Sequence, residues 1–177
     1  MPVEDRLSIG MVAGEPSGDL LAATVVQALR DRAPGCVLSG IGGPQMLAHG
    51  FDAWYPMQKL AVNGYADVLA HLPELLAIRR TIRDRWLAER PAAFVGVDAP
   101  DFNFSLEQAL REGGIPTVHF IGPSLWAWRG ERIHKIRKAV SHMLVVFPFE
   151  ERIYRDAGVP VTYVGHPLAR AVERVPD

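Results

Sequence analysis

Short apolar runs alternate along the chain with longer stretches of mixed apolar and polar residues. The apolar runs predict strands, at Leu7–Val12, Val37–Ile41, Ala92–Val97, Thr117–Ile121, Leu144–Phe147 and Val161–Val164. The mixed stretches predict helices, at Asp19–Arg32, Gln45–His49, Pro73–Glu89, Phe104–Glu112, Glu131–Val140 and Glu150–Asp156. Strands that alternate with helices predict a Rossmann-like, doubly wound parallel sheet with right-handed crossovers, in an α/β domain. Only in Phe51–Leu72 do the apolar residues follow neither a clear helical nor a clear strand periodicity.

The composition narrows the class of protein. The chain has 177 residues, of which 49% are hydrophobic and 22% charged, so one globular domain is expected. A net charge of −1 argues against a nucleic-acid-binding surface. Cys36 is the only cysteine, which excludes an internal disulfide and is typical of a reducing compartment. The sequence shows neither a signal peptide nor an apolar run near the ~18 residues of a membrane span, so we expect a cytoplasmic protein that can at most attach to a membrane from the side.

Glycines, prolines, acids and tryptophans concentrate directly after the predicted strands. They occupy Gly14–Asp19, Gly40–Pro44, Asp98–Asn103, Gly122–Arg129, Phe147–Glu150 and Gly165–Pro167. The carboxyl ends of parallel strands share one edge of the sheet, where open α/β folds bind their ligands. We therefore expect the functional site at this edge.

Two carboxylates follow the third predicted strand. Asp98 comes at its end, and Asp101 lies closer to the next helix, with Pro100 between them. Asp101 is the better candidate for a helix cap, and Asp98 is the better candidate for a residue that takes part in the chemistry. The alternative that both residues only cap the helix stays open.

The loop Gly14–Asp19 matches neither a GxGxxG dinucleotide motif nor a Walker A loop. It places backbone N–H groups at a helix start, which favours an anion or a hydroxyl group. Glu15 is a candidate ligand residue, and Ser17 is either a second one or an N-cap. The glycines at Gly42 and Gly43 could cradle a sugar or a phosphate.

Aromatic and basic residues follow the fourth predicted strand. Trp126 and Trp128 can stack on a sugar ring or a base, and Arg129 can hold a phosphate. The alternative for one of the two tryptophans is packing on the domain. The basic helix that follows is either a solvated face or a docking surface for acidic lipid heads.

The histidines do not predict a metal site. All six are scattered, without HxxxH, cysteine pairs or Asp-x-Asp. His166 stands apart because it is expected at the same sheet edge as Asp98.

An apolar series precedes the arginine-rich helix, namely Val62, Tyr65, Val68, Leu69, Leu72, Leu75 and Leu76. Apolar residues flanked by basic ones are typical of a surface that dips into an anionic membrane interface. Burial in the core is the alternative for the same residues.

Together, six of these segments resemble the lipid-A-disaccharide synthases of Gram-negative bacteria. They are Val12–Asp19, Gly40–Met46, Val97–Asn103, Pro123–Arg129, Phe147–Glu150 and Val164–Pro167, in the same order and over most of the chain. The resemblance implies one half of a two-domain GT-B glycosyltransferase. Residues 1–177 would be the acceptor-binding domain, without the domain that binds the UDP-sugar donor.

The resemblance also implies a reaction, which joins UDP-2,3-diacylglucosamine to 2,3-diacylglucosamine 1-phosphate with inversion and releases UDP. Asp98 would be the general base, no metal or cofactor would be needed, and the enzyme would lie on the cytoplasmic face of the inner membrane. Residues matched to the acceptor or inter-domain cleft would be Glu15, Ser17, Gly18, Gly42, Gly43, Asn103, Trp126, Arg129 and His166.

Two other functions stay open from the residues alone. One is a nucleotide-sugar-binding Rossmann domain without transferase activity, and the other is a lipid-binding module of the membrane surface. Homo-oligomerisation is also left open.

Overall fold

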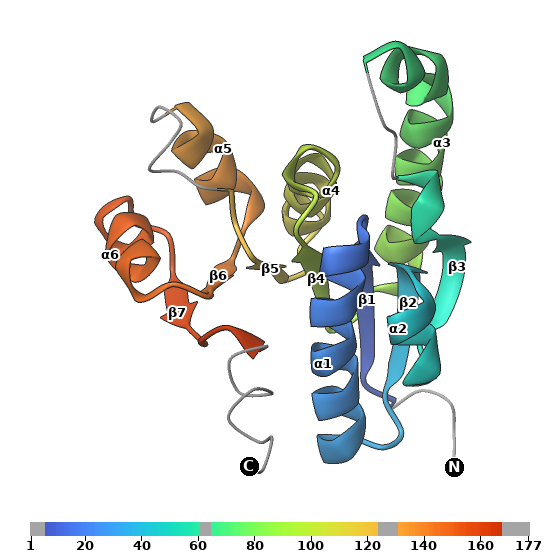
Figure 1. Ribbon diagram of the computed structural model, residues 1–177, viewed down its shortest axis with the longest axis horizontal. Coiled ribbons are helices and arrows are strands. Elements are labelled where there is room, and N and C mark those ends of the chain that lie inside the picture. Colours follow the sequence, from blue (N-terminus) through green and yellow to red (C-terminus); the bar gives the residue numbers. More distant parts are fainter. Residues whose placement is uncertain (1–5, 61–64, 124–130, 168–177) are drawn as a thin grey trace, which may run out of the picture.

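The computed structural model contains a single parallel sheet and describes residues 6–60, 65–123 and 131–167, with only the backbone of residues 65–70 and 131. Seven strands lie in the order β3-β2-β1-β4-β5-β6-β7, and each neighbouring pair is parallel (Figure 1). Their bounds are β1 Ser8–Ala13, β2 Val37–Gly42, β3 Asp52–Pro56, β4 Ala93–Val97, β5 Thr117–Phe120, β6 His142–Val145 and β7 Val161–Tyr163. The predicted Rossmann-like α/β fold is confirmed.

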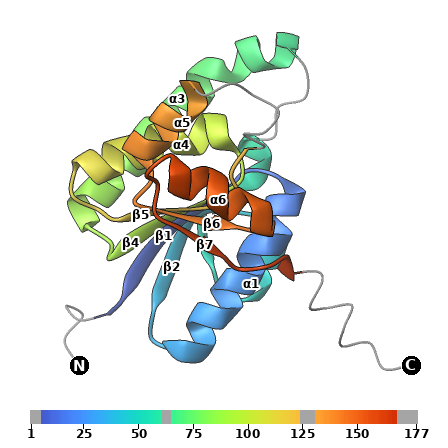
Figure 2. The ribbon, with the colours of Figure 1, turned by 90° about the vertical axis from the view of Figure 1, so that its left-hand side faces the viewer.

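Helices cover both faces of the sheet. They are α1 Pro16–Arg32, α2 Pro44–Ala48, α3 Tyr65–Glu89, α4 Pro100–Glu112, α5 Glu131–Ala139 and α6 Pro148–Asp156, with a 3₁₀ turn η2 at Met57–Lys59. The layer formed by α3, α4 and α5 lies across the sheet from α1 (Figure 2). The apolar clusters agree with this arrangement, because Met11 packs with α1 residues whereas its neighbour Val12 packs with residues of α3 and α4. Alternate side chains of β1 therefore pack against the helices on opposite faces of the sheet.

Trp86 of α3 is the largest fully buried side chain among the residues that the structure describes. Its indole lies over two neighbouring strands, where a Cβ placed on Gly10 or Gly40 would come within 2.7 or 2.8 Å of the ring. Phe94 meets the indole edge-on, with ring centroids 5.0 Å apart. The two strand glycines therefore make room for this tryptophan, a role that the sequence analysis did not assign to any of the three residues.

The structure corrects two predictions for Phe51–Leu72. This region contains β3, which extends the sheet beyond β2, and it contains the start of α3 at Tyr65. Pro73 therefore lies inside α3 and not in its first turn. Proline removes only one helical hydrogen bond, and the packing of α3 through Ile78, Ile82 and Trp86 outweighs this loss.

Four helices begin earlier than predicted, each with a proline in its first turn. The starts are Pro16 in α1, Pro44 in α2, Pro100 in α4 and Pro148 in α6, one to four residues before the predicted positions. Proline is pre-organised for the first helical position, where its missing N–H would have no helical acceptor. These prolines start the helices, whereas the sequence analysis treated them as parts of loops.

Candidate functional site at the carboxyl edge

The candidate site lies where the loops after β1 and β4 meet. These strands are neighbours at the centre of the sheet, with Ala13 paired to Val97. A Cβ on Gly14 would lie 3.0 Å from the Cβ of Ala99, so a glycine permits the close approach of the two loops. The helices that follow, α1 and α4, lie on opposite faces (Figure 2). This divergence opens a crevice at the sheet edge, as predicted from the fold class.

Asp98 has a strained backbone conformation at the edge of this crevice. Its φ is 51° and that of Ala99 is 45°, so two successive residues with side chains are left-handed. The Asp98 N–H donates to Phe120 O at 3.0 Å, and the Asn103 Nδ2 donates to Asp98 O at 2.8 Å. Backbone contacts on both sides thus fix the residue. Its half-buried carboxylate makes no hydrogen bond or salt bridge with the part of the chain that the structure describes.

Asn103 belongs to a fully buried polar cluster beneath Asp98. Besides Asp98 O, its Nδ2 reaches Val12 O at 3.5 Å. One turn later in α4, Glu107 Oε1 lies 2.7 Å from Nδ1 of His119 on β5, and neither side chain is exposed. Gly96 leaves the space that these groups fill, because a Cβ there would overlap Glu107 Oε1. Burial raises the pKa of Glu107, and the interaction with His119 only partly opposes this shift. Through the Asn103 hydrogen bond to Asp98 O, this buried cluster holds the turn at Asp98 in place.

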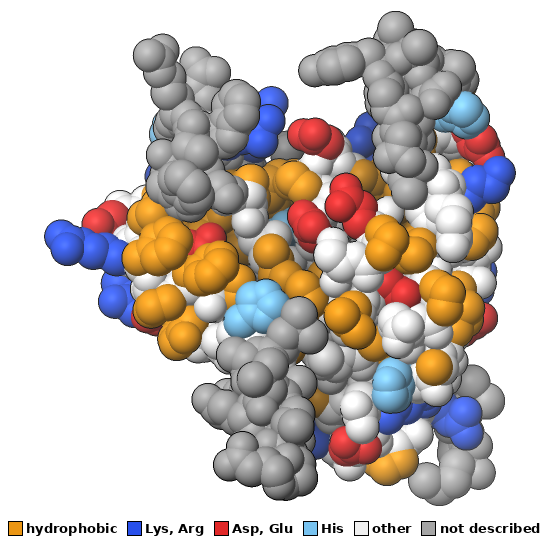
Figure 3. Space-filling model, viewed as in Figure 1, with side chains coloured by type: hydrophobic (Ala, Val, Ile, Leu, Met, Phe, Trp, Pro, Cys, Tyr) orange, Lys and Arg blue, Asp and Glu red, His pale blue; other side chains and the backbone are white. Residues whose placement is uncertain are grey.

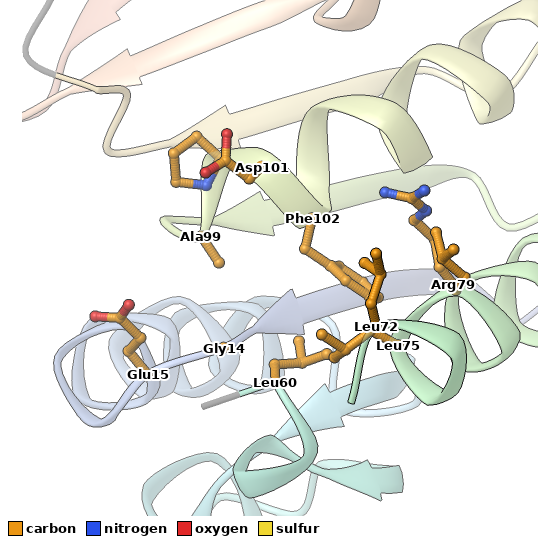
Figure 4. Close-up of a pocket in the computed structure, with 11 residues that line it drawn as sticks. Gly14, Glu15, Leu60, Leu72, Leu75, Arg79, Ala99, Asp101 and Phe102 are labelled. Carbon is orange, nitrogen blue, oxygen red and sulfur yellow. The ribbon is translucent and has the colours of Figure 1, made fainter. Parts of the chain in front are cut away.

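A cavity of about 340 Å³ opens beside Asp98. Glu15 and Asp101 stand on one side of it, and Leu72, Leu75 and Phe102 on the other (Figure 4). Acidic side chains also gather between hydrophobic ones on this face of the molecule (Figure 3). The cavity therefore offers carboxylates next to an apolar wall, which suits an amphiphilic ligand.

The structure contradicts the cap role predicted for Asp101, whereas the role predicted for Asp98 stays a prediction. Asp101 does not cap α4, because the N-cap residue is Ala99 and no side chain caps that helix start. Asp101 is instead exposed in the first turn and lines the cavity. Asp98 does not line it but lies toward α1, where a Cβ on Gly18 would be 3.8 Å from the Asp98 Cβ. The two carboxylates therefore flank the same loop on different sides.

The loop after β1 presents Glu15 and Ser17 to solvent and buries Gly18. Ser17 is not the N-cap of α1, because Glu15 holds that position without a capping hydrogen bond from its side chain. The first turn of α1 therefore leaves N–H groups available to a ligand.

Asp19 is a structural residue that the sequence analysis missed. It is 1% exposed, and its carboxylate accepts three backbone N–H groups from Gly43, Gln45 and Met46, at 2.9 to 3.0 Å. The side chain thereby caps the start of α2 and ties it to the start of α1. Its signal in the sequence is an acid in the first helical turn, which by itself indicates only a favourable helix dipole interaction.

Gly42 and Gly43 are both buried. A Cβ on Gly42 would lie 2.7 Å from Met46 Sδ, and one on Gly43 would overlap the Asp19 carboxylate. Packing accounts for both glycines, and the Gly43 N–H is already donated to Asp19. Their contact with a ligand stays a prediction.

The other predicted site residues are placed only in part. His166 is half-buried after β7. Leu72 and Leu76 are exposed and Leu75 is half-buried, whereas of Tyr65, Val68 and Leu69 the structure gives only the backbone within α3. Trp126, Arg129 and Val62 lie outside the described residues.

Two kinds of feature are absent from the described residues, a cluster of metal ligands and a membrane-spanning helix. Within residues 6–60, 65–123 and 131–167, no three histidine, cysteine or acidic side chains are grouped as metal ligands would be. Of the helices described, none combines the length and apolar character needed to cross a bilayer.

Comparison with solved structures supports the fold. MurG of Acinetobacter baumannii, a GT-B glycosyltransferase, superposes with a TM-score of 0.52 at 16% sequence identity. The match covers 81% of this chain and 42% of MurG. The chain thus shares the Rossmann-like fold of the part of MurG that it matches.

Comparison of sequences is more specific. A relative in Bordetella avium (strain 197N), a lipid-A-disaccharide synthase, is 66% identical over 171 residues, which are 97% of this chain and 43% of the relative. Proteins of the same name in Thiobacillus denitrificans and Paraburkholderia xenovorans are 64% and 60% identical over 92% and 97% of this chain, and over 44% of their own lengths. The chain thus spans less than half the length of these curated relatives. The model of the lipid-A-disaccharide synthetase family matches residues 9–177, and the chain belongs to this family.

Proposed function

We propose that this chain is the acceptor-binding half of a lipid-A-disaccharide synthase. The complete enzyme would join UDP-2,3-diacylglucosamine to 2,3-diacylglucosamine 1-phosphate, with inversion, and release UDP. Family membership over residues 9–177 is the observation that carries this proposal. The donor UDP-sugar would be held by a second Rossmann-like domain, as in other GT-B enzymes.

Asp98 is proposed as the general base of the reaction. Such a base must reach the acceptor's 6-hydroxyl and take its proton while the oxygen attacks the anomeric carbon, a contribution of roughly 10²–10⁴-fold. Asp98 suits this task because its carboxylate has no partner among the described residues and its backbone is held from both sides. A fixed backbone keeps a reacting group in its productive position.

Several residues around Asp98 are proposed to bind the substrates. Glu15 and Ser17 are exposed at the start of α1, where free N–H groups can hold a hydroxyl or phosphate oxygen. Gly18 lies in the same first turn, where a Cβ would be in ordinary van der Waals contact with the Asp98 Cβ, and its contact with a substrate is part of the proposal. Trp126, Arg129 and His166 follow from the family resemblance, with stacking on a sugar, phosphate binding and hydrogen bonding as their expected roles.

The apolar part of α3 is proposed to reach the membrane surface where both lipid substrates reside. Leu72 and Leu76 are 41% and 42% exposed and line one cavity together with Leu75, so they form a contiguous apolar surface on α3. Val62, Tyr65, Val68, Leu69 and Leu75 are assigned to the same surface from the sequence. The face of the membrane is expected to be cytoplasmic, because nucleotide-sugar donors are made there.

The proposal is tested by placing this chain in a full-length relative. In a chimera, residues 7–177 replace the segment of the Bordetella avium synthase with which they align, and formation of the disaccharide from the two lipid substrates is measured. Asp98→Asn should lower turnover by roughly 10²-fold or more because the amide cannot accept the proton. The control is Asp31→Asn, an exposed acid in the last turn of α1 that does not line the cavity, which should keep turnover within a few-fold.

Two outcomes would contradict the proposal. Normal turnover of the Asp98→Asn chimera would place the base elsewhere, while leaving the family assignment intact. Tight binding of UDP by this chain alone, together with an unmutated chimera that folds but makes no disaccharide, would favour a nucleotide-sugar-binding domain without transferase activity.

A further inference from the structure

Two hydrogen bonds from different elements hold the backbone of Asp98. Its N–H donates to Phe120 O at the end of β5, at 3.0 Å, and its O accepts from Asn103 Nδ2 of α4, at 2.8 Å. Asp98 and Ala99 both have a left-handed backbone, which persists only while the surrounding structure imposes it. The position of the Asp98 carboxylate therefore depends on how α4 and β5 are held relative to each other.

A hydrogen bond between Glu107 and His119 joins these same two elements. Glu107 lies one helical turn after Asn103 in α4. His119 directly precedes Phe120 in β5. The Glu107 Oε1 is 2.7 Å from the His119 Nδ1, and both side chains are fully buried. The pair thus ties together the two segments that supply the hydrogen bonds to Asp98.

Close packing prevents this pair from shifting alone. Gly96 of β4 is the sheet neighbour of His119. A Cβ on Gly96 would overlap Glu107 Oε1 and lie 3.1 Å from Asn103 Cγ. The Phe104 ring of α4 packs against the imidazole of His119, with ring centroids 4.6 Å apart. A change in the hydrogen bond must therefore move α4 or β5.

The pair consists of a neutral acid and a neutral imidazole. Neither Glu107 Oε2 nor His119 Nε2 has a hydrogen-bond partner among the residues that the structure describes. An ion pair here would lack the further hydrogen bonds that make buried charges tolerable. Burial also raises the pKa of Glu107, which favours its protonated form. The Glu107 carboxyl group therefore donates its proton to His119 Nδ1, and an amide in its place can donate in the same way.

We propose that Glu107 and His119 are positioning residues, which set the place of the Asp98 carboxylate by holding α4 and β5 together. Because both are fully buried, they act only through Asn103 and Phe120. This inference rests on the proposed function, in which Asp98 is the general base. Loss of the hydrogen bond should let the left-handed turn relax and move the carboxylate away from the acceptor hydroxyl, so turnover should fall more than substrate binding.

The kinetic test uses the chimera with the Bordetella avium synthase. Glu107→Met keeps the length of the side chain but has no donor, whereas the matched variant Glu107→Gln keeps both. We expect Glu107→Met to lower kcat about tenfold or more with the acceptor KM within about twofold, and Glu107→Gln to keep kcat within about threefold. In an Asp98→Asn background, Glu107→Met should have no further effect, because a residue that acts only through Asp98 loses its influence with it.

A second measurement does not depend on activity. Hydrogen exchange of the Asp98 amide is followed in the chain itself, with the amides of β2 as the reference for global stability. His119→Phe breaks the same hydrogen bond and keeps an aromatic ring in its place, so it also serves if Glu107→Met does not fold. Relative to β2, exchange at Asp98 should become about tenfold faster in Glu107→Met and in His119→Phe, but not in Glu107→Gln.

The outcomes separate this inference from the proposed function. Equal kcat values for Glu107→Met and Glu107→Gln, in a chimera that Asp98→Asn impairs, would overturn the inference and leave Asp98 as the base. An equal loss from Glu107→Met with and without Asp98→Asn would also overturn it, since the effect would then be general. Normal turnover of Asp98→Asn would contradict the proposed function alone. Hydrogen exchange would then decide, because unchanged exchange at Asp98 overturns the inference and faster exchange supports it.

Discussion

Replacing Asp19 with alanine should destabilise the domain far more than replacing an exposed acid of the same helix. The Asp19 carboxylate is 1% exposed and accepts three backbone N–H groups at the start of α2. Alanine leaves these donors without an acceptor in a buried place that water does not readily enter. A hydrogen bond to a charged group contributes about 1.5–3 kcal/mol, and bonds that share one carboxylate do not add fully. We therefore expect a loss of about 3–4 kcal/mol in the free energy of unfolding.

The measurement is urea unfolding of the chain followed by circular dichroism. With a urea dependence of about 2 kcal/mol per molar, the midpoint of Asp19→Ala should fall by about 1.5–2 M. Asp19→Asn retains one acceptor oxygen and should lose clearly less. The control Asp31→Ala removes an exposed acid from the last turn of α1, where a negative charge is unfavourable, and should leave the midpoint unchanged or slightly raised. Equal midpoints for Asp19→Ala and Asp31→Ala would refute the assignment of Asp19 as a cap.

Other expected outcomes concern buried groups. Because the folded-state pKa of Glu107 is raised above its ordinary value of 4.5, its contribution to stability is full below that value and is lost as pH rises through the raised pKa. Glu107→Gln cannot titrate, so its unfolding free energy relative to the unmutated chain should increase from pH 4.5 upward in urea titrations; a difference independent of pH would contradict this. Tyr154→Phe removes a buried hydroxyl that has no hydrogen-bond partner among the described residues. Thermal unfolding should therefore show unchanged stability or a gain of up to about 1 kcal/mol. A loss of more than about 1 kcal/mol would contradict this expectation. Gly40→Ala would place a Cβ against Met11 O at a φ of 141° and should lower the free energy of unfolding in urea by more than about 3 kcal/mol. The control Gly35→Ala has open space around the new Cβ and should lower it little. Similar losses in the two variants would count against the packing described for Trp86.

The periodicity of the sequence was sufficient to predict the fold class but not every element. The short apolar runs that became β1, β4 and β5 are bounded by clear turn residues, so their type and position could be predicted. β3 was not predicted, because its apolar run Ala53–Tyr55 has only three residues, stands between Asp52 and Pro56 and is only half-buried at the edge of the sheet. The start of α3 was missed because Pro73 is a strong helix-breaking signal, and only tertiary packing further along the helix outweighs it.

The candidate site was predictable to the level of loops and not of side-chain roles. The concentration of unusual residues after strands indicates the sheet edge through topology alone. The burial of Asn103, which was expected to contact a ligand, depends on the left-handed turn at Asp98 and Ala99, and a single sequence does not reveal that turn. The Glu107–His119 pair also escaped prediction, because its members come from different elements and meet only when α4 packs on β5.

The pairing of β1 with β4 has a consequence for synthesis on the ribosome. β1 emerges first and finds β2 soon afterwards, but its other side pairs with a strand that begins only at Ala93. Until that strand has been translated, the nascent chain presents an unpaired apolar strand edge, which invites association with other chains. A product arrested before Ala93 should therefore depend on chaperones, and that dependence should end only after β5, the other neighbour of β4, and the two strands that follow it have been translated.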